Sequence, residues 1–271
     1  MKMFRSLFSV AIVAAFSATL LAQQPVTGYH RVACIKVKPG QYAAFRTWAA
    51  GDGHKVLQAE ADSGELSTWF LLRSVIPEGA SAECDYLAVA MYPGLPPGPT
   101  NGLEHLAAAV KRAGLTESAQ QFVDQRNALT TLISDNMFRN VAVVGAMKKG
   151  DYFRVNYMKL ADPNDMQAYI AYEKKVWQPL AEQMTKDGVS SGWSLNVQVL
   201  PQGSELPYDA VTVDVFPTWD SVFQPDHQFA ERFRKVHPDM DLGTTMETYS
   251  KLRSIEFREL LSVEDMVTPT K

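Results

Sequence analysis

Histidine and cysteine, the side chains that most often bind transition metals, are scarce in this chain. It has five histidines and two cysteines among 271 residues. No histidine shows ligand spacing to another histidine, a cysteine or a carboxylate, such as H-x-x-x-H on a helix. The sequence therefore predicts no dedicated metal or haem site and no cofactor. His30 aligns with Phe153 in the internal repeat described below, which predicts an apolar environment for it.

The chain also lacks the common catalytic and nucleotide-binding motifs. It has no G-x-S-x-G elbow, no phosphate-binding loop and no G-x-G-x-x-G sequence. These absences exclude the usual serine-hydrolase and nucleotide-binding classes. The charge balance is 26 basic against 30 acidic residues. A mildly acidic protein of this kind lacks the basic surface that nucleic-acid binding requires.

Only one apolar run approaches the length of a membrane span, and it lies at the N-terminus. Lys2 and Arg5 precede apolar residues 7–21, and Ala22 follows them. This order is typical of a secretory signal peptide, so we expect residues 1–22 to be removed and the mature protein to be secreted or periplasmic. A retained anchor is the alternative, but the run is shorter than the roughly 20 residues that span a bilayer. The mature chain would carry 24 basic and 30 acidic residues, a net charge of −6, and would not contact a membrane.

An internal repeat is the strongest pattern in the chain. Shifting the sequence by about 124 positions aligns about ten identities within about thirty residues, where unrelated sequences would give about two. YHRV from Tyr29 matches YFRV from Tyr152, and MFRN from Met137 matches EFRE from Glu256. Two copies of about 120 residues are too few and too long for a solenoid. We therefore divide the mature chain into repeats at residues 23–148 and 149–271.

Each repeat predicts the order strand, helix, strand, strand, helix, strand. The first repeat has strands at 29–37, 69–75, 86–92 and 137–144, and the second has strands from Tyr152 and at 193–199, 210–216 and 256–261. The first helix of each repeat is expected to be interrupted, by Gly51-Asp52-Gly53 and by Pro179. Further helices are expected at 103–113, 117–132, 227–236 and 242–254. Residues 94–102, rich in proline and glycine, predict a surface loop or lid, and the tail after Val263 is expected to be loose.

This order is the ferredoxin-like βαββαβ arrangement, an α+β class with helices on one face of an antiparallel sheet. With two copies, the chain resembles the dimeric α/β-barrel superfamily with both halves fused into one polypeptide. The resemblance covers about residues 28–262 and rests on element order and the repeat. It implies a fused, pseudo-dimeric barrel, and we expect a monomer. That superfamily includes EthD-like proteins, small quinol-type monooxygenases and haem-handling enzymes, so the resemblance leaves the function open.

The two cysteines are expected to lie close together in such a fold. Cys34 is in the first strand and Cys84 begins the third, which would be its antiparallel neighbour. An exported protein can form a disulfide between them, and two buried thiols are the alternative. The second repeat has Tyr157 and Tyr208 near the matching positions, so any bridge is local to the first repeat.

The inward-facing residues of the predicted barrel differ between the repeats. We take Leu87, Val89 and Met91 to face the helices, so that the alternate residues face the interior. The second repeat then supplies hydrogen-bonding groups and the first an apolar wall, which is the usual form of a small-molecule site. Mutual hydrogen bonding between these polar residues is the alternative. The candidate ligand-binding residues are Arg154, Tyr157, Ser194, Asn196, Gln198, Thr212 and Asp214.

Repeated arginines allow two interpretations. Arg31 and Arg154 recur in the first strands, and Arg139 and Arg258 recur in the fourth. A repeated arginine can anchor a carboxylate or phosphate, but we favour a structural ion pair that holds the halves together.

Three functions remain open. The leading hypothesis is an exported protein that binds a small, partly apolar molecule in the cavity of the second repeat. The enzyme alternative is a cofactor-independent monooxygenase-like or isomerase-like activity in the same cavity. Its weak catalytic candidates are Asp214 as base, with Asn196 or Arg154 orienting the substrate, and His54. The third hypothesis is a protein without a pocket that acts through surface contacts.

Overall fold

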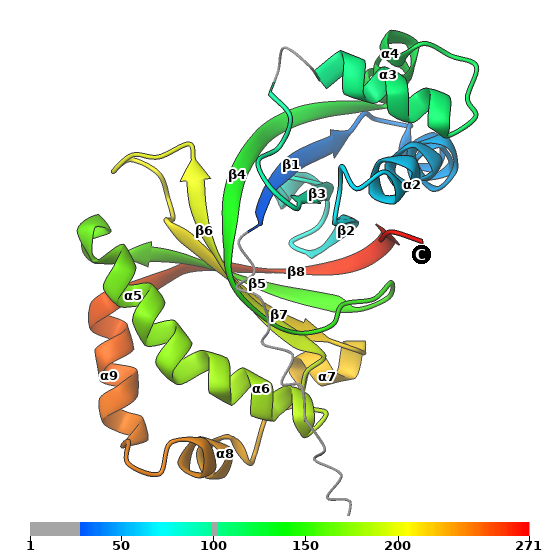
Figure 1. Ribbon diagram of the computed structural model, residues 1–271. Coiled ribbons are helices and arrows are strands. Elements are labelled where there is room, and N and C mark those ends of the chain that lie inside the picture. Colours follow the sequence, from blue (N-terminus) through cyan, green and yellow to red (C-terminus); the bar gives the residue numbers. More distant parts are fainter. Residues whose placement is uncertain (1–27, 99–101, 271) are drawn as a thin grey trace, which may run out of the picture.

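The computed structural model describes residues 28–98 and 102–270 (Figure 1). The predicted signal peptide lies outside these residues, as do residues 99–101 of the predicted loop or lid. Within the described residues, no helix combines the length and apolar character that a membrane crossing requires.

The two halves of the chain contain matching series of elements. The first half comprises β1 (Tyr29–Val37), α1 (Tyr42–Trp48), α2 (His54–Asp62), β2 (Thr68–Ile76), β3 (Tyr86–Tyr92), α3 (Gly102–Arg112), α4 (Ala119–Leu129) and β4 (Thr130–Gly145). The second half comprises β5 (Tyr152–Leu160), α5 (Met166–Tyr172), α6 (Gln178–Lys186), β6 (Gly192–Leu200), β7 (Ala210–Phe216), α7 (Trp219–Phe223), α8 (Phe229–Val236), α9 (Leu242–Leu252) and β8 (Arg253–Val267). The predicted β-α-β-β-α-β order is confirmed in both halves, with additional helices before each fourth strand.

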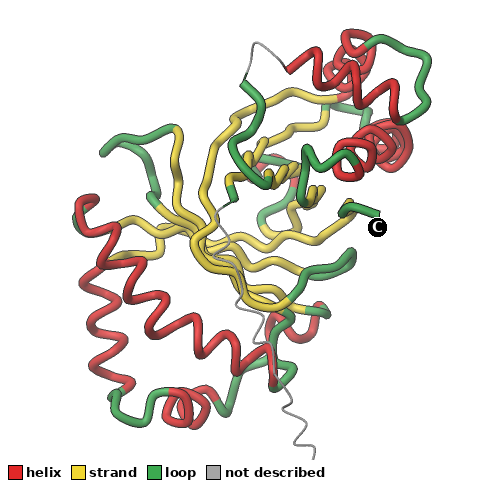
Figure 2. Tube along the Cα trace, in the orientation of Figure 1, coloured by secondary structure: helices red, strands yellow, loops and turns green. Residues whose placement is uncertain are grey.

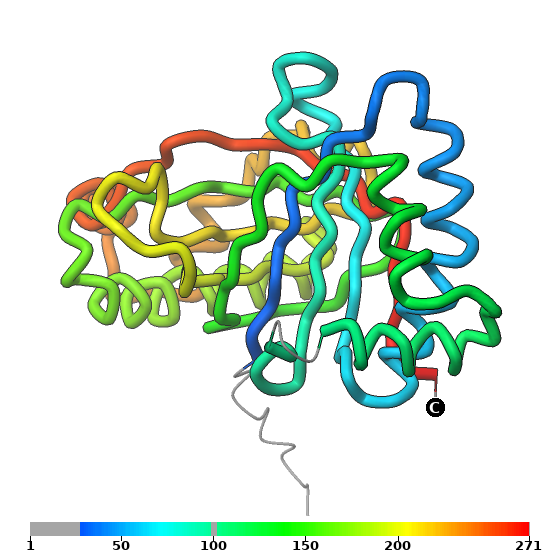
Figure 3. The backbone as a smooth tube through the Cα atoms, turned by 90° about the horizontal axis from the view of Figure 1, so that it is seen from above, coloured from blue at the N-terminus to red at the C-terminus, as the bar shows by residue number. Residues whose placement is uncertain are grey.

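The strands form one closed antiparallel barrel in the order β1-β3-β2-β8-β5-β7-β6-β4. Within each half the order is the ferredoxin-like one, and two further pairings, β2 with β8 and β4 with β6, join the halves. The helices cover the outside in two groups on opposite sides of the barrel (Figures 1 and 2). The predicted fused α/β barrel is therefore confirmed. Figure 3 shows the barrel from a second direction.

The fourth strands are longer than predicted because they close the barrel. The helix expected to reach Leu132 ends at Leu129, and β4 begins at Thr130. The prediction of a loose tail after Val263 is wrong, because β8 continues to Val267, which pairs with Trp69 of β2. Partners so distant in sequence give no local signal, so hydrophobic periodicity could not show that this segment is a strand.

The predicted interruptions of the first helices occur at matching places. A π-helical turn at Ala49–Gly53 separates α1 from α2, and another at Glu173–Trp177 separates α5 from α6. Pro179 stands at the start of α6, directly after this π-helical turn. The proline therefore begins a second helical segment, one of the two outcomes expected for it.

The close approach of β4 and β6, where Gly145 pairs with Gly192, gives a first prediction. Gly145 has a φ of +74°, and a Cβ there would lie 2.1 Å from the Ser191 carbonyl oxygen. Gly114 has a φ of +73°, but its Cβ would meet no described atom within 4 Å. We expect Gly145→Ala to lower the free energy of unfolding by about 3 kcal/mol or more, and Gly114→Ala by about 1 kcal/mol. Urea denaturation of the two variants checks this, and equal losses would contradict it.

Candidate functional site

The barrel encloses a cavity of about 910 Å³. Every strand contributes to its wall, and that volume lies in the usual range for small-molecule sites. The apolar part of the wall includes Phe70, Leu72, Val89, Val155 and Val213. The barrel interior is thus not packed solid, and the hypothesis of a protein without a pocket is wrong.

Two hairpin loops line one end of this cavity, which we call the mouth. Because neighbouring strands are antiparallel all round the barrel, β2 and β6 run in the same direction, and the loops that follow them lie at the same end. The β2–β3 loop contributes Pro77 and Glu83, and the β6–β7 loop contributes Pro201 and Tyr208. The mouth therefore has matching parts from the two halves.

The predicted orientation of the third strands is wrong. Leu87, Val89 and Met91 line the cavity, whereas Ala88 and Ala90 pack with the helices of the first half. Both faces of these strands are covered, so alternation shows that two faces exist but not which one is inside. Small alanines let the helices approach the sheet closely, and the larger aliphatic residues line the space inside.

Four of the seven candidate ligand-binding residues line the cavity, namely Tyr157, Ser194, Asn196 and Gln198. Asn196 Nδ2 donates a hydrogen bond to Ser194 Oγ at 3.0 Å, so this pair is joined as the alternative interpretation expected. Gln198 is 6% exposed, and its Oε1 has no hydrogen-bond partner among the described residues.

The other three candidates, Arg154, Thr212 and Asp214, do not line the cavity and belong to a network outside the barrel. Arg154 Nε and Nη2 donate to Asp214 Oδ2 at 3.2 and 3.1 Å. Asn156 Nδ2 donates to the same oxygen at 3.1 Å and to Thr212 Oγ1 at 3.2 Å. Because β7 has the opposite orientation to the expected one, Asp214 cannot act as a base on a molecule in the cavity.

The repeated arginines of the first strands form structural ion pairs within each half. Arg31 binds Asp135 of β4 through two nitrogens, and Arg154 binds Asp214 of β7. Arg258 Nε donates to Asn156 Oδ1 at 2.8 Å. The ion-pair interpretation fits better than an anion site, but these pairs stabilise each half rather than joining the two.

His54, the second weak catalytic candidate, also does not line the cavity. Its Nδ1 lies 2.7 Å from Asp265 Oδ2, and Lys149 Nζ lies 3.4 Å from the other oxygen of that carboxylate. His54 belongs to α2, outside the barrel, so it cannot reach a molecule bound inside.

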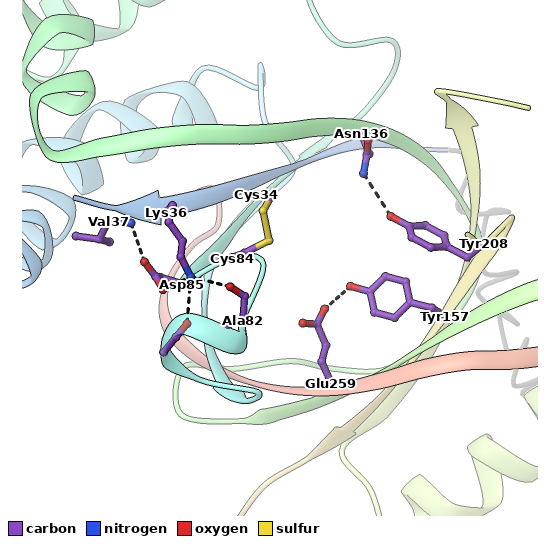
Figure 4. Close-up of a disulfide and its surroundings, with 11 residues drawn as sticks. Cys34, Lys36, Val37, Ala82, Cys84, Asp85, Asn136, Tyr157, Tyr208 and Glu259 are labelled. Carbon is purple, nitrogen blue, oxygen red and sulfur yellow. Dashed lines mark hydrogen bonds and ion pairs between the residues drawn. A yellow bond between two sulfur atoms is a disulfide. The ribbon is translucent and has the colours of Figure 1, made fainter. Parts of the chain in front are cut away.

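A disulfide between Cys34 and Cys84 ties the β2–β3 loop to β1 at the mouth (Figure 4). Lys36 Nζ supports the same loop by donating to the carbonyl oxygens of Ala82 at 2.7 Å and Gly79 at 3.2 Å. In the second half, Lys159 Nζ donates to the carbonyl oxygen of Leu206 at 2.8 Å. A lysine therefore anchors each mouth loop. Where the first half has the Cys34–Cys84 disulfide, the second half has the packed rings of Tyr157 and Tyr208.

These rings belong to a cluster of aromatic and acidic residues at the mouth. The Tyr157 and Tyr208 rings meet edge to face at 4.7 Å, and Phe257 stacks on Tyr157 at 3.9 Å. Tyr157 donates a hydrogen bond to Glu259 Oε1 (Figure 4). Burial raises the pKa of Glu259, the hydrogen bond from Tyr157 opposes that rise, and the charge of Glu83 adds to it.

Sequence reasoning missed Glu83 and Glu259 as site residues. Glu259 stands in the EFRE segment that marked the end of the repeat, two residues after Phe257, so period-two alternation could have placed both on one face. Glu83 adjoins Cys84, and the predicted cysteine pair could have indicated its position beside the first strand.

His30 and Phe138 form another part of the cavity wall, with their rings stacked at 5.3 Å. Burial lowers the pKa of His30 to about 4, and its Nδ1 has no hydrogen-bond partner in the described part of the chain. The imidazole is therefore neutral near pH 7, in agreement with the apolar environment predicted for it. Residues 28–98 and 102–270 contain no group of three histidine, cysteine or acidic side chains placed to hold a metal ion.

Comparison with known proteins supports the fold alone. No protein-family model and no curated protein matches the sequence. The chain is similar to the structure of a candidate monooxygenase from Fusobacterium nucleatum, with a TM-score of 0.55 and 11% identity over 90% of this chain and 95% of that one. A candidate monooxygenase from Lactobacillus acidophilus gives a TM-score of 0.51 and 10% identity over 89% and 96%. At these identities the likeness shows that the chain has the dimeric α/β-barrel fold, with both halves in one polypeptide.

The buried histidine predicts a specific pH dependence of stability. With a pKa of about 4 in the folded protein and 6.5 in the unfolded chain, the unfolded state binds more protons between these values. The contribution of His30 to the free energy of unfolding is therefore fully present above pH 6.5. As the pH falls to 4, the protein loses this contribution, about 3 kcal/mol. We expect His30→Phe, which copies Phe153 of the other half, to remove this part of the acid dependence.

Urea denaturation of the wild type and of His30→Phe, at several pH values from 7.5 to 4, measures how the free energy of unfolding of each depends on pH. His227→Asn, at an exposed position, is the control and should keep the wild-type profile. Identical profiles for wild type and His30→Phe would show that His30 titrates normally.

Proposed function

We propose that the protein binds a small, partly apolar molecule inside the barrel. The observation that carries this proposal is the 910 Å³ cavity, whose wall is largely apolar and contains a few polar groups. His30 and Gln198 line this cavity, and two of their atoms, His30 Nδ1 and Gln198 Oε1, are buried and have no partner among the described residues. A buried polar atom without a partner costs roughly 1–3 kcal/mol, so a ligand that reaches it gains affinity and orientation.

Both halves contribute polar groups to the wall, so the predicted division into an apolar first half and a polar second half is wrong. The polar residues of the first half are His30, Ser67, Thr68, Ser81, Glu83, Ser134, Asn136 and Asn140. The prediction holds only where β2 and β6 are compared. Ser194, Asn196 and Gln198 of β6 take the places that Phe70, Leu72 and Ser74 have in β2. A ligand that has both polar and apolar groups fits this wall. Export, removal of residues 1–22 and a monomeric state remain predictions from the sequence.

A variant whose cavity is filled by larger side chains should no longer bind the small molecule. Val89 and Val213 are matching residues of the two halves, and both line the cavity. We expect the double variant Val89→Trp/Val213→Trp to bind the neutral fluorescent probe N-phenyl-1-naphthylamine at least tenfold more weakly than wild type, because the indole rings occupy the cavity.

The matched control is Leu103→Trp/Leu132→Trp, at positions 54% and 57% exposed, which should bind like wild type. Thermal unfolding establishes that each variant is folded. Equal affinity of the two double variants, or no binding by wild type, would refute a ligand-binding cavity.

A second candidate function is an enzyme that uses Glu259 as its base. Glu259 faces the cavity, burial raises its pKa, and Tyr157 holds its carboxylate in place. A carboxylate with a raised pKa is a better base near neutral pH. In the isomerase-like form, a C–H bond beside a carbonyl breaks, the proton moves to Glu259, and the same proton returns to a different carbon. The two structural neighbours are described as candidate monooxygenases, which is compatible with an enzyme of this fold.

The enzyme candidate predicts turnover that depends on Glu259. We expect the wild-type protein to convert cyclohex-3-enone into conjugated cyclohex-2-enone, followed by ultraviolet absorbance. Glu259→Gln still accepts the hydrogen bond from Tyr157 but cannot take a proton, so kcat should fall at least about a hundredfold. Glu256→Gln, exposed on the same strand, should keep the wild-type rate. No turnover by wild type, or equal rates for the two variants, would exclude this reaction.

A further inference from the structure

The charged side chains around the cavity have one sign. Glu83 and Glu259 line it, whereas no lysine or arginine does among the described residues. His30 is the remaining titratable nitrogen in the wall, and burial lowers its pKa to about 4, which leaves it neutral near pH 7. The cavity therefore carries negative charge that nothing in its own wall balances, and it favours a cation over an anion of the same shape.

Both carboxylates belong to the mouth, although they come from different halves of the chain. Glu83 is exposed in the β2–β3 loop beside the disulfide, and Glu259 is half-buried on β8. The charge of Glu83 contributes to the raised pKa of Glu259, and both carboxylates help to raise the pKa of Tyr208 to about 12, where burial is the main cause. These groups are thus close enough for their charges to interact. A cation placed between the carboxylates would relieve their repulsion.

Aromatic rings surround the same position. Tyr208 packs edge to face on Tyr157, and Phe257 stacks on the Tyr157 ring. Phe257 is 42% exposed, an unusual fraction for a phenylalanine that lines a cavity. The face of an aromatic ring attracts a cation within about 6 Å of its centre. The rings can therefore contact both the charged end and the apolar body of a ligand.

Gln198 sets an independent requirement on the hydrogen-bonding groups of the ligand. Its main-chain N–H donates to the Asp209 carbonyl oxygen at 3.0 Å, which places Gln198 next to Tyr208 at the mouth. Gln198 lines the cavity and is 6% exposed, and its Oε1 is buried without a partner among the described residues. An amide oxygen only accepts hydrogen bonds, so its partner must present an N–H or O–H group. An ammonium that still carries hydrogen fits this oxygen and both carboxylates, and a quaternary ammonium does not.

We propose that the ligand is a protonated amine with an apolar body, held with its ammonium between Glu83 and Glu259 and its N–H directed to Gln198. The apolar body lies deeper in the barrel, against the aliphatic and phenylalanine wall. This inference rests on the proposed binding function and specifies the chemistry of its ligand.

Three probes of one shape test the charge preference. Isothermal titration calorimetry at pH 7.5 and low salt compares protonated 2-phenylethylamine, neutral 2-phenylethanol and anionic 3-phenylpropanoate. We expect the ammonium to bind at least tenfold more tightly than the alcohol, and the carboxylate to bind most weakly. Glu83→Gln and Glu259→Gln should each reduce the ratio of ammonium to alcohol affinity by about tenfold. Glu256→Gln removes the same charge outside the cavity and should leave that ratio unchanged.

The outcomes separate this inference from the binding function itself. If the alcohol binds as tightly as the ammonium, and Val89→Trp/Val213→Trp abolishes both, the cavity binds ligands but the charge preference is refuted. An ammonium preference that survives Glu83→Gln and Glu259→Gln, or the filled cavity, would place the amine elsewhere and overturn the inference. If none of the three probes binds and N-phenyl-1-naphthylamine does not bind either, the binding function itself fails. Glu83 lies in an exposed loop, so its variant remains informative even if Glu259→Gln does not fold.

Discussion

Hydrogen bonding between the two halves, through the pairs β2–β8 and β4–β6, is the constraint on which the rest of the structure depends. A four-stranded sheet has two edges with unpaired N–H and C=O groups, and pairing each edge with the other half removes all four. The long fourth strands make this possible, because β4 and β8 each pair with the first strand of their own half and with the second strand of the other. A closed barrel leaves room inside, whereas two sheets packed face to face would have filled it with side chains.

The two halves have the same β-α-β-β-α-β order of strands and helices, but different side chains at matching positions in the shared interior. Cys34 and Cys84 of the first half correspond to Tyr157 and Tyr208 of the second, and both pairs anchor a hairpin loop at the mouth. The disulfide contributes a compact and rigid side of the mouth. The tyrosines contribute rings and hydroxyl groups, one of which is directed to Glu259. Part of the chemistry of the site thus comes from Tyr157 and Tyr208, the residues at the bridge positions of the second half.

Alternate residues of the same strands serve separate purposes. On β5, Arg154 and Asn156 belong to the network outside the barrel, and Tyr157 lines the cavity. The outer network satisfies polar groups under the helices and holds β5 to β7. The inner residues have partners on only some of their polar atoms, and Gln198 Oε1 has none in the described part of the chain. This difference separates residues that stabilise the barrel from residues available to a ligand.

The sequence by itself determined the duplication, the order of the elements and most strand positions, because repeated identities and period-two alternation are local signals. The bounds of β1, Tyr29–Val37, agree with those expected, and the barrel class followed from two βαββαβ units. Tertiary structure alone decided which face of β7 is inside, and so removed Asp214 from the site, because both faces of that strand are buried and alternation is the same in either orientation. It also decided that residues 263–267 form strand rather than tail. The meeting of Glu83 with Glu259 likewise depends on barrel closure, which brings together residues from opposite ends of the chain without any local signal.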